Sequence, residues 1–265
     1  MARSLKEARK AYKKKDVQAM IKAHNIKDLK KFEASHHHFK GKYLKSIVYG
    51  GLDGIITTFA VVAGVAGASL SSGILLILGF ANLVADGISM AVGDYLSSKA
   101  ERDFYSTEKE REKWEAKNYP KGEKMEMIDI YMKRGLSKFD ASKLVSIISK
   151  KKNFFIDQMM IEELKLMDSS KSSPLKNALV TFISFSVFGF IPILIFLTDF
   201  IFPGFIGRPF LYTIILTGLA LFLLGIAKFK FTRKHWLRSA LETLIIGGLA
   251  AGVAYLVGYL LSGLA

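Results

Sequence analysis

Residues Ile77–Lys117 read ILGFANLVADGISMAVGDYLSSKAERDFYSTEKEREKWEAK. The segment begins as an apolar membrane span, ends as a charged, water-facing helix, and contains no proline, so one continuous helix is expected. In its apolar half, Asn82, Asp86, Met90 and Asp94 recur every four residues, which places them on one slowly rotating helix face. Amide, carboxylate and thioether groups are all metal ligands, so this stripe inside a bilayer predicts an ion path.

The rest of the chain predicts an all-α membrane protein. Apolar windows of about 20 residues, the length that crosses a hydrocarbon core, occur near Ser46–Ser69, Gly73–Ser97, Leu175–Leu197, Pro209–Ala227 and Leu241–Leu264. We therefore predict five transmembrane helices, with a three-helix cytosolic domain inserted between spans two and three. The expected divisions are a basic N-terminal arm (residues 1–45), spans one and two (46–98), the cytosolic helical metal-binding domain (99–172) and spans three to five (173–265).

The charges of the loops predict the orientation of these spans. The net charge is +15, and basic segments alternate with nearly uncharged ones, as the positive-inside rule requires. The N-terminus is therefore expected in the cytosol and the C-terminus on the far side, and the charge needs no nucleic-acid partner. The polar N-terminus predicts no cleavable signal peptide. The absence of cysteine excludes disulfides, thiolate metal sites and thiol catalysis.

The basic arm itself is open to two interpretations. Its lysines are placed to lie against anionic lipid headgroups, at about 1 kcal/mol for each basic side chain near the surface. The alternative is a solvated tail. The run of three histidines, His36–His38, is weak evidence for a metal site.

The first span adds a second buried carboxylate. Asp53 lies among small residues, Gly50, Gly51 and Gly54, which let helices approach closely in lipid. Counted at 1.5 Å per residue from the flanking lysines, Asp53 is expected level with Met90, with Asp86 deeper and Asp94 nearer the cytosol. The alternatives are a hydrogen-bonded Asp53 beside a helix bend and a Met90 that only packs.

The charged region after span two contains three groups of candidate metal ligands. We expect a helix that ends near Lys117, a second over Glu123–Arg134 and a third from Ser137 to Leu166. Each helix carries one group on one face, and a bundle can bring the groups together on a metal ion. The alternative is a set of solvated faces paired with nearby lysines. The candidate ligands are Glu112, Glu115, Glu123, Glu126, Met159, Met160, Glu162 and Glu163.

Two features of the last three spans are notable. Pro192 predicts a kink in the third. Glu242, at the start of the fifth, is expected to pair with Arg238, and the alternative is a proton-carrying carboxylate. The chain has neither a phosphate-binding loop nor a His-Glu-x-x-His motif, so no enzyme is predicted.

These segments, in this order, resemble the vacuolar iron transporter family over nearly the whole chain after about His36. The resemblance rests on LDGIITTFAVVAGVAGAS in span one, NLVADGISMAVGDYLSSKAE in span two, the EREKWE and GEKMEM pairs, and MMIEEL before span three. It implies a five-span homodimer in the bilayer that moves Fe²⁺, and often Mn²⁺, out of the cytosol into a vacuole or equivalent store. Proton counterflow is implied as the driving force.

The resemblance also implies roles for particular residues. Asp53 and Met90 match the family's path residues, and Glu112, Glu115, Glu123, Glu126, Met159, Met160 and Glu163 match its cytosolic metal-binding domain, where Zn²⁺, Co²⁺ or Ni²⁺ are further candidates. Some members have a path glutamate where this chain has Asn82, and a neutral amide cannot carry a proton. Asp86, one turn along the same face, is the candidate replacement.

The resulting hypothesis is a proton-coupled Fe²⁺ exporter from cytosol to organelle lumen, or across the plasma membrane if the source is prokaryotic. Asp86 and Glu242 are the candidates for proton coupling. Two alternatives remain open at this stage. A membrane-anchored metal sensor would bind metal in the segment Lys99–Lys171 without flux, and a passive divalent-cation channel would conduct independently of a proton gradient.

Overall fold

The computed structural model describes residues 10–12, 14–23, 43–170, 172–232 and 235–264, and among these it contains helices and turns but no strand. The chain divides into two units, residues 1–45 and 46–265. The first contains the short helix α2 (Val17–Ala23). The histidine run His36–His38 lies outside the described residues.

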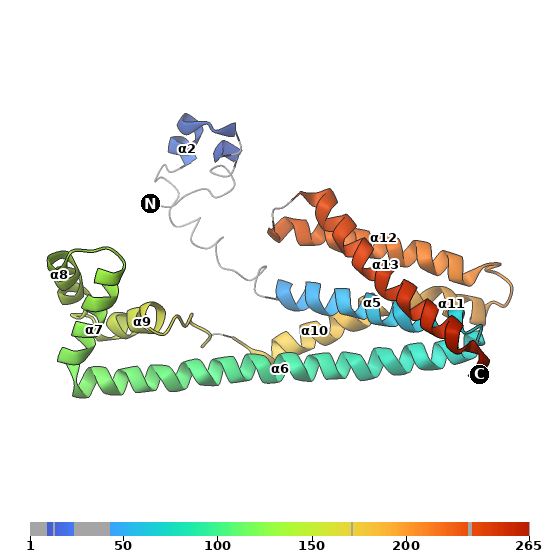
Figure 1. Cartoon of the computed structure of the whole chain (residues 1–265), viewed down its shortest axis with the longest axis horizontal. Coiled ribbons are helices and arrows are strands. Elements are labelled where there is room, and N and C mark those ends of the chain that lie inside the picture. Colours follow the sequence, from blue (N-terminus) through green and yellow to red (C-terminus); the bar gives the residue numbers. More distant parts are fainter. Residues whose placement is uncertain (1–9, 13, 24–42, 171, 233–234, 265) are drawn as a thin grey trace. The chain divides into compact units, whose positions relative to one another are not determined.

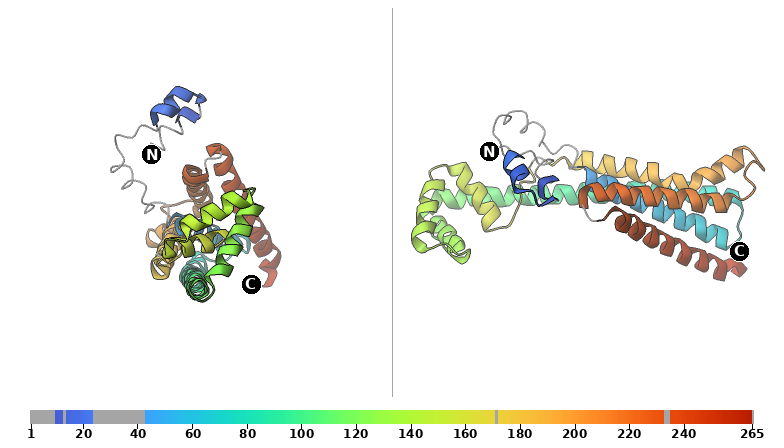
Figure 2. Two further views of the ribbon diagram at one scale, coloured as in Figure 1. Left: turned by 90° about the vertical axis from the view of Figure 1, so that its left-hand side faces the viewer. Right: turned by 90° about the horizontal axis from the view of Figure 1, so that it is seen from above.

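The second unit is built from long helices. In chain order the helices from the unit boundary onward are α5 (Leu44–Gly67), α6 (Ser72–Asn118), α7 (Pro120–Lys133), α8 (Lys138–Ile148), α9 (Lys152–Glu162), α10 (Pro174–Gly189), α11 (Ile191–Ile201), α12 (Pro209–Thr232), α13 (Trp236–Leu261) and the 3-10 turn η2 (Ser262–Leu264). Figures 1 and 2 show α6 running along the bundle of α5 and α10–α13 and continuing past it to α7–α9.

The helices confirm the prediction of an all-α membrane protein. Those long and apolar enough to cross a membrane are Ser46–Gly67, Ser72–Asn118, Pro209–Lys228 and Trp236–Leu264, and a fifth span results when α10 and α11 are taken together. The last helix begins at Trp236, before the predicted start at Leu241, because its first turn carries the charged residue Arg238, which an apolar window leaves out.

The predicted kink in the third span is confirmed. The pair α10 and α11 bends by 50° at its junction, where Pro192 lies in the first turn of α11. Proline has no N–H to donate to the preceding turn, so the helix cannot continue straight through it. Gly189 ends α10, and a Cβ there would lie 2.7 Å from the Leu83 side chain and 2.9 Å from the Gly54 carbonyl oxygen.

The continuous helix predicted from Ile77 to Lys117 is also confirmed. Ser71 caps it by accepting a hydrogen bond from the Ile74 N–H, and it runs for 47 residues, which at 1.5 Å per residue is ~70 Å. One helix therefore connects the apolar bundle to the polar helical domain, which we define as residues 99–166.

The prediction of one third helix over Ser137–Leu166 is wrong in one respect. The structure divides it into α8 and α9 at Ser149–Lys151. The apolar residues of both halves, among them Val145, Ile148, Phe155 and Met159, pack into one cluster with α7. In a single straight helix the apolar residues of the two halves would be spread along its length and could not all reach the same cluster. Burial of both halves therefore favours a turn between them.

Glycines set the close approach of the membrane helices, as predicted for span one. A Cβ on Gly54 would lie 2.4 Å from the carbonyl oxygen of Phe185 on α10, and one on Gly67 would lie 2.2 Å from that of Tyr255 on α13. Real Cβ atoms do not approach backbone oxygens so closely, and the helices would have to separate.

The contact between α5 and α13 leads to a stability prediction. Replacing Gly258 with alanine would place a Cβ 2.0 Å from the Gly64 carbonyl oxygen, whereas Gly248 on the same helix has nothing within 4 Å. We expect G258A to lower the free energy of unfolding by about 1–3 kcal/mol and G248A to be neutral or stabilising. Thermal unfolding in detergent measures both, and equal melting temperatures for the two variants would contradict the packing described.

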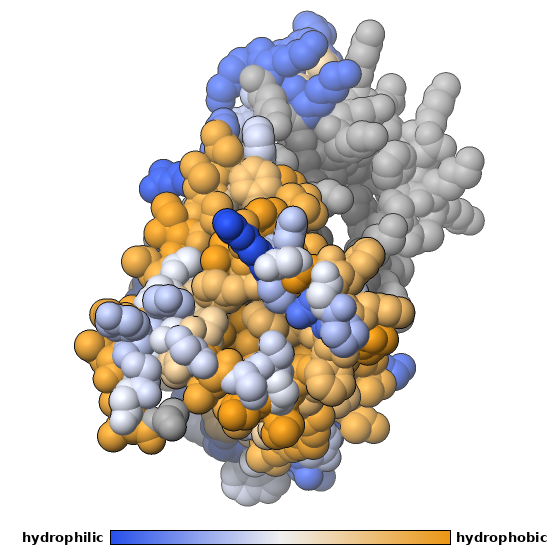
Figure 3. Space-filling view, turned by 90° about the vertical axis from the view of Figure 1, so that its right-hand side faces the viewer, coloured by the Kyte–Doolittle hydropathy of each residue, from blue (hydrophilic) through white to orange (hydrophobic). Residues whose placement is uncertain are grey.

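The end of the bundle where α5 ends and α6 begins carries little charge. Figure 3, which faces this end, shows mostly apolar and weakly polar side chains with few strongly hydrophilic ones. The 69–71 turn contains Ser69, Leu70 and Ser71.

Candidate metal site and membrane path

The turn between α6 and α7 brings three glutamates together. α6 ends at Asn118, and Pro120 begins α7 at once. The Tyr119 ring lies over Gly122, where a Cβ would come within 2.2 Å of the ring, so the tight turn depends on that glycine. Glu112, Glu115 and Glu123 each offer a carboxylate oxygen, and these atoms all lie within 4.8 Å of one another.

Two of these carboxylates are buried. Glu112 is fully enclosed and Glu123 nearly so. Burial is the largest cause that raises the pKa of each carboxyl group, to about 7 in both. Neighbouring carboxylates raise the pKa further, since like charges disfavour ionisation. Neither oxygen of Glu112 accepts a hydrogen bond from the described residues. Three carboxylate oxygens this close together, two of them from buried side chains, form a suitable site for a cation.

Two more glutamates act on this cluster electrostatically. Burial and the charge of Glu126 raise the pKa of Glu163, and Glu163 is the largest charged contributor to the raised pKa of Glu112. Glu163 lies at the end of α9, where one of its carboxylate oxygens is buried without a hydrogen-bond partner among the described residues. The glutamates of all three predicted groups therefore lie close enough to affect one another's charge.

Arg111 is the cation of this cluster. Its Nη1 donates to Glu115 at 2.6 Å and its Nε donates to Glu108 at 3.0 Å. Its Nη2 lies 2.7 Å from Glu112 Oε1, an ion pair that lacks hydrogen-bond alignment. The hydrogen bond to Glu115 is the largest cause that raises the pKa of Arg111.

The remaining predicted ligands are placed differently. Met159 and Met160 are fully buried, the first in the apolar cluster of α7, α8 and α9 and the second in a cluster with Tyr105 and Ile156. Glu162 pairs with Arg134 at the end of α7. The methionines thus fill apolar cores, and their role as metal ligands stays a prediction.

In the membrane half of α6, the predicted polar stripe lies on one partly enclosed face. Asn82, Asp86, Met90 and Asp94 are each half-buried, while Val84, Ile88 and Val92 between them are exposed. The Asn82 side-chain nitrogen is buried without a partner among the described residues. Met90 packs against the central apolar cluster of the bundle.

Asp94 is held by hydroxyl groups from three helices. Ser46 of α5 and Thr181 of α10 donate to one carboxylate oxygen at 3.0 Å and 2.5 Å. Ser98 of α6 donates to the other at 3.2 Å. Three such donors satisfy much of a carboxylate's capacity to accept hydrogen bonds, so Asp94 joins α5, α6 and α10.

These contacts fix the register of α5 against α6 and correct one expectation. Asp53 lies as far along α5 from Ser46 as Gly87 lies along α6 from Asp94. Asp53 is therefore level with Asp86, and the two carboxylates repel each other. The predicted depth of Asp53, level with Met90, differs by about one turn, because depths counted from the flanking lysines assumed that both spans enter the membrane at equal levels.

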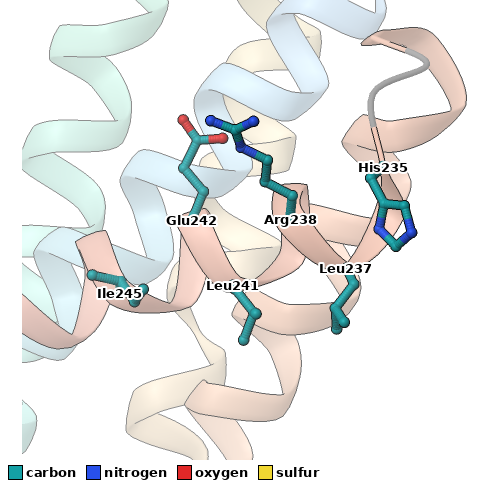
Figure 4. Close-up of a pocket in the computed structure, with 6 residues that line it drawn as sticks. All are labelled: His235, Leu237, Arg238, Leu241, Glu242 and Ile245. Atoms are coloured by element: carbon teal, nitrogen blue, oxygen red, sulfur yellow. The ribbon is translucent and has the colours of Figure 1, made fainter.

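Glu242 has a different partner from the one predicted. Figure 4 shows it beside Arg238 on α13, yet its ion pair is with Lys228 of α12 at 3.8 Å. Both groups lie at the end of the α12–α13 hairpin where the two helices are joined, and the Glu242 side chain is 56% exposed. That exposure gives it a surface environment rather than one inside the bundle.

Sequence reasoning missed Arg111, Ser46 and Thr181. Arg111 stood inside the quoted EREKWE segment, and its spacing to Glu108 and Glu115, i−3 and i+4, was the available signal. Ser46 and Thr181 are far from Asp94 in sequence, so only the packed bundle reveals them.

Comparisons with known proteins identify relatives of this chain. The sequence model of the VIT family matches residues 44–259. The chain is 41% identical to the vacuolar iron transporter of Toxoplasma gondii, over 98% of this chain and 89% of that protein. It is 41% identical to the vacuolar iron transporter of Plasmodium falciparum (96% and 95%) and 34% identical to vacuolar iron transporter 1 of Arabidopsis thaliana (83% and 86%).

Proposed function

We propose, from the premise that the chain belongs to the VIT family, that it moves Fe²⁺ from the cytosol into a vacuole or similar organelle in exchange for protons. The family relatives carry the name vacuolar iron transporter, and the spans provide a multi-pass membrane protein. The names of these relatives do not mention proton exchange, which we add as part of the proposal.

One observation carries the proposal. Glu112 and Glu115 lie on the same continuous helix as the membrane residue Asp86, and Glu123 lies in the first turn of the helix that follows. A divalent ion collected by this cluster therefore has a further carboxylate, Asp86, on the membrane half of α6. Oxygen ligands accept Fe²⁺ and Mn²⁺, and we extend the same site to Zn²⁺, Co²⁺ and Ni²⁺.

Asp53 and Asp86 are the proposed membrane site. Two facing carboxylates lower the cost of bringing a doubly charged ion into low dielectric, and the same two groups can hold a proton when the ion leaves. Met90 and Asn82 continue the stripe on either side of Asp86. We assign Asp94 to holding the helices together, and Glu242 remains a second candidate for proton coupling.

The orientation and assembly are part of the proposal. The N-terminus and the polar helical domain face the cytosol, which follows from the distribution of lysine and arginine. Two copies form a homodimer in the bilayer, as the family resemblance implies. Chemical crosslinking in native membranes tests the dimer.

Transport by purified protein in liposomes tests the function. We expect Fe²⁺ uptake into liposomes with an acidic lumen, and its collapse when the pH gradient is removed. Flux that ignores the gradient would indicate a channel instead, and metal binding without flux would indicate a sensor. Competition with Mn²⁺, Zn²⁺ and Ca²⁺ in the same assay defines the cargo.

A further inference from the structure

We propose that Arg111 is a displaceable counter-ion, which occupies the charge position of the metal in the empty site and leaves Glu112 and Glu115 when a divalent ion binds. This inference rests on the proposed function, because it assumes that the glutamate cluster collects metal. It assigns a role to a residue that is not itself a metal ligand.

The contacts of the guanidinium group place it on the same carboxylates that would hold the ion. Nη1 lies 2.6 Å from Glu115 and Nη2 lies 2.7 Å from Glu112. Both glutamates belong to the group of three whose oxygens lie within 4.8 Å of one another. The Arg111 side chain is 40% exposed, so it has room to move away from the cluster without unfolding the domain.

Electrostatics makes the two cations compete. Carboxylates this close repel strongly where one of them is fully buried, so the metal-free domain needs a positive charge among them. A divalent ion on the same oxygens would repel the guanidinium at a similar distance. Occupation by one cation therefore disfavours occupation by the other.

Glu108 offers Arg111 a place to remain. It lies one turn before Glu112, accepts from Nε at 3.0 Å, and does not belong to the group of three oxygens. When Glu112 and Glu115 turn toward a metal ion, the guanidinium can keep its Glu108 contact. The exchange then needs only side-chain rotation.

This competition has a consequence for selectivity. Arginine stays protonated at every physiological pH, so the guanidinium keeps its own charge in the cluster. A monovalent ion brings no more charge than the guanidinium that it would displace, whereas a divalent ion does. The arrangement therefore favours divalent cations over Na⁺ and K⁺.

Thermal unfolding of the full-length protein, with and without Mn²⁺, tests the inference. We expect R111Q to lower the melting temperature of the metal-free protein by about 5 °C, because the carboxylates lose their cation. At saturating Mn²⁺ the variant should melt within about 1 °C of the metal-loaded parent. Mn²⁺ should therefore raise the melting temperature of R111Q more than that of the parent. The control R102Q removes an arginine from the same helix that pairs with Asp103 at 3.6 Å, and it should change neither temperature.

Other outcomes separate the inference from the proposed function. An equal loss of stability in R111Q with and without Mn²⁺ would make Arg111 a purely structural cation. A parent stabilised by Mn²⁺ beside an R111Q that is not would make Arg111 necessary for binding. Both results overturn the inference alone, whereas a parent that gains no stability from Mn²⁺ overturns the collection site itself. R111K keeps the charge and should stay close to the parent in both states, so a result like that of R111Q would also count against displacement.

Discussion

Fe²⁺ flux through liposome-reconstituted protein should fall by about 100-fold in D53N and in D86N. The two carboxylates lie close enough to repel each other, and in the proposed path each would supply negative charge to an ion in low dielectric. A carboxylate that lowers the transport barrier by about 3 kcal/mol accounts for a 100-fold loss when it is removed, at about 1.36 kcal/mol for each tenfold change in rate. Asparagine keeps the size of the side chain and removes the charge, so the loss reports electrostatics.

The control for these variants is D103N, on the water-facing part of α6. Asp103 is exposed and pairs with Arg102, and its amide variant should transport at the parent's rate. D94N provides a second comparison, because an amide can still serve the three hydroxyls around position 94. Full flux in D53N and D86N, with Asp94 indispensable, would reverse the roles that we assign to these carboxylates.

Much of the architecture could be predicted from the sequence because apolar length and proline positions report it directly. The windows for the spans, the continuous α6 and the kink at Pro192 all follow from hydropathy and backbone chemistry. The glutamate spacing likewise suggested convergence, since Glu112 and Glu115 share a face of α6. These are local patterns, which the chain displays without knowledge of its tertiary partners.

The errors arose where tertiary packing decides. Asp53 is level with Asp86 because Ser46 and Thr181 bind Asp94 and set the register, and no local signal reports such distant pairs. The α8–α9 turn exists because one apolar cluster buries both halves. Glu242 forms an ion pair with Lys228 of the neighbouring helix instead of Arg238, which lies one turn earlier on its own helix. Periodicity indicates which residues share a helix face, but it does not identify the residues that pack against that face.

Replacing Glu112 with glutamine should weaken Mn²⁺ binding by the purified protein on the order of 100-fold, because a ligand carboxylate is lost, and changing even an outer-shell partner costs about 10–100-fold. Glu112 is the fully buried member of the cluster, and its oxygens have no other hydrogen-bond partner among the described residues. The matched control is E110Q, an exposed glutamate two residues earlier on α6. Calorimetric titration should show parent-like affinity for E110Q, and equal affinities for both variants would place the ion elsewhere.

Metal binding should also strengthen as the pH rises from 6 to 8, by up to about tenfold per pH unit for each proton displaced at the lower end of this range, and by less toward pH 8. The carboxyl groups of Glu112 and Glu123 have their pKa raised from 4.5 to about 7 in the folded protein, so protons compete with metal in this range. Between pH 4.5 and 7 the folded state then binds more protons than the unfolded state. The metal-free protein should therefore lose stability as the pH rises through that window, and Mn²⁺ should restore it most at pH 8. A melting temperature that instead rises with pH without metal, and a Mn²⁺ affinity unchanged from pH 6 to 8, would mean that these carboxylates are already ionised in the empty site.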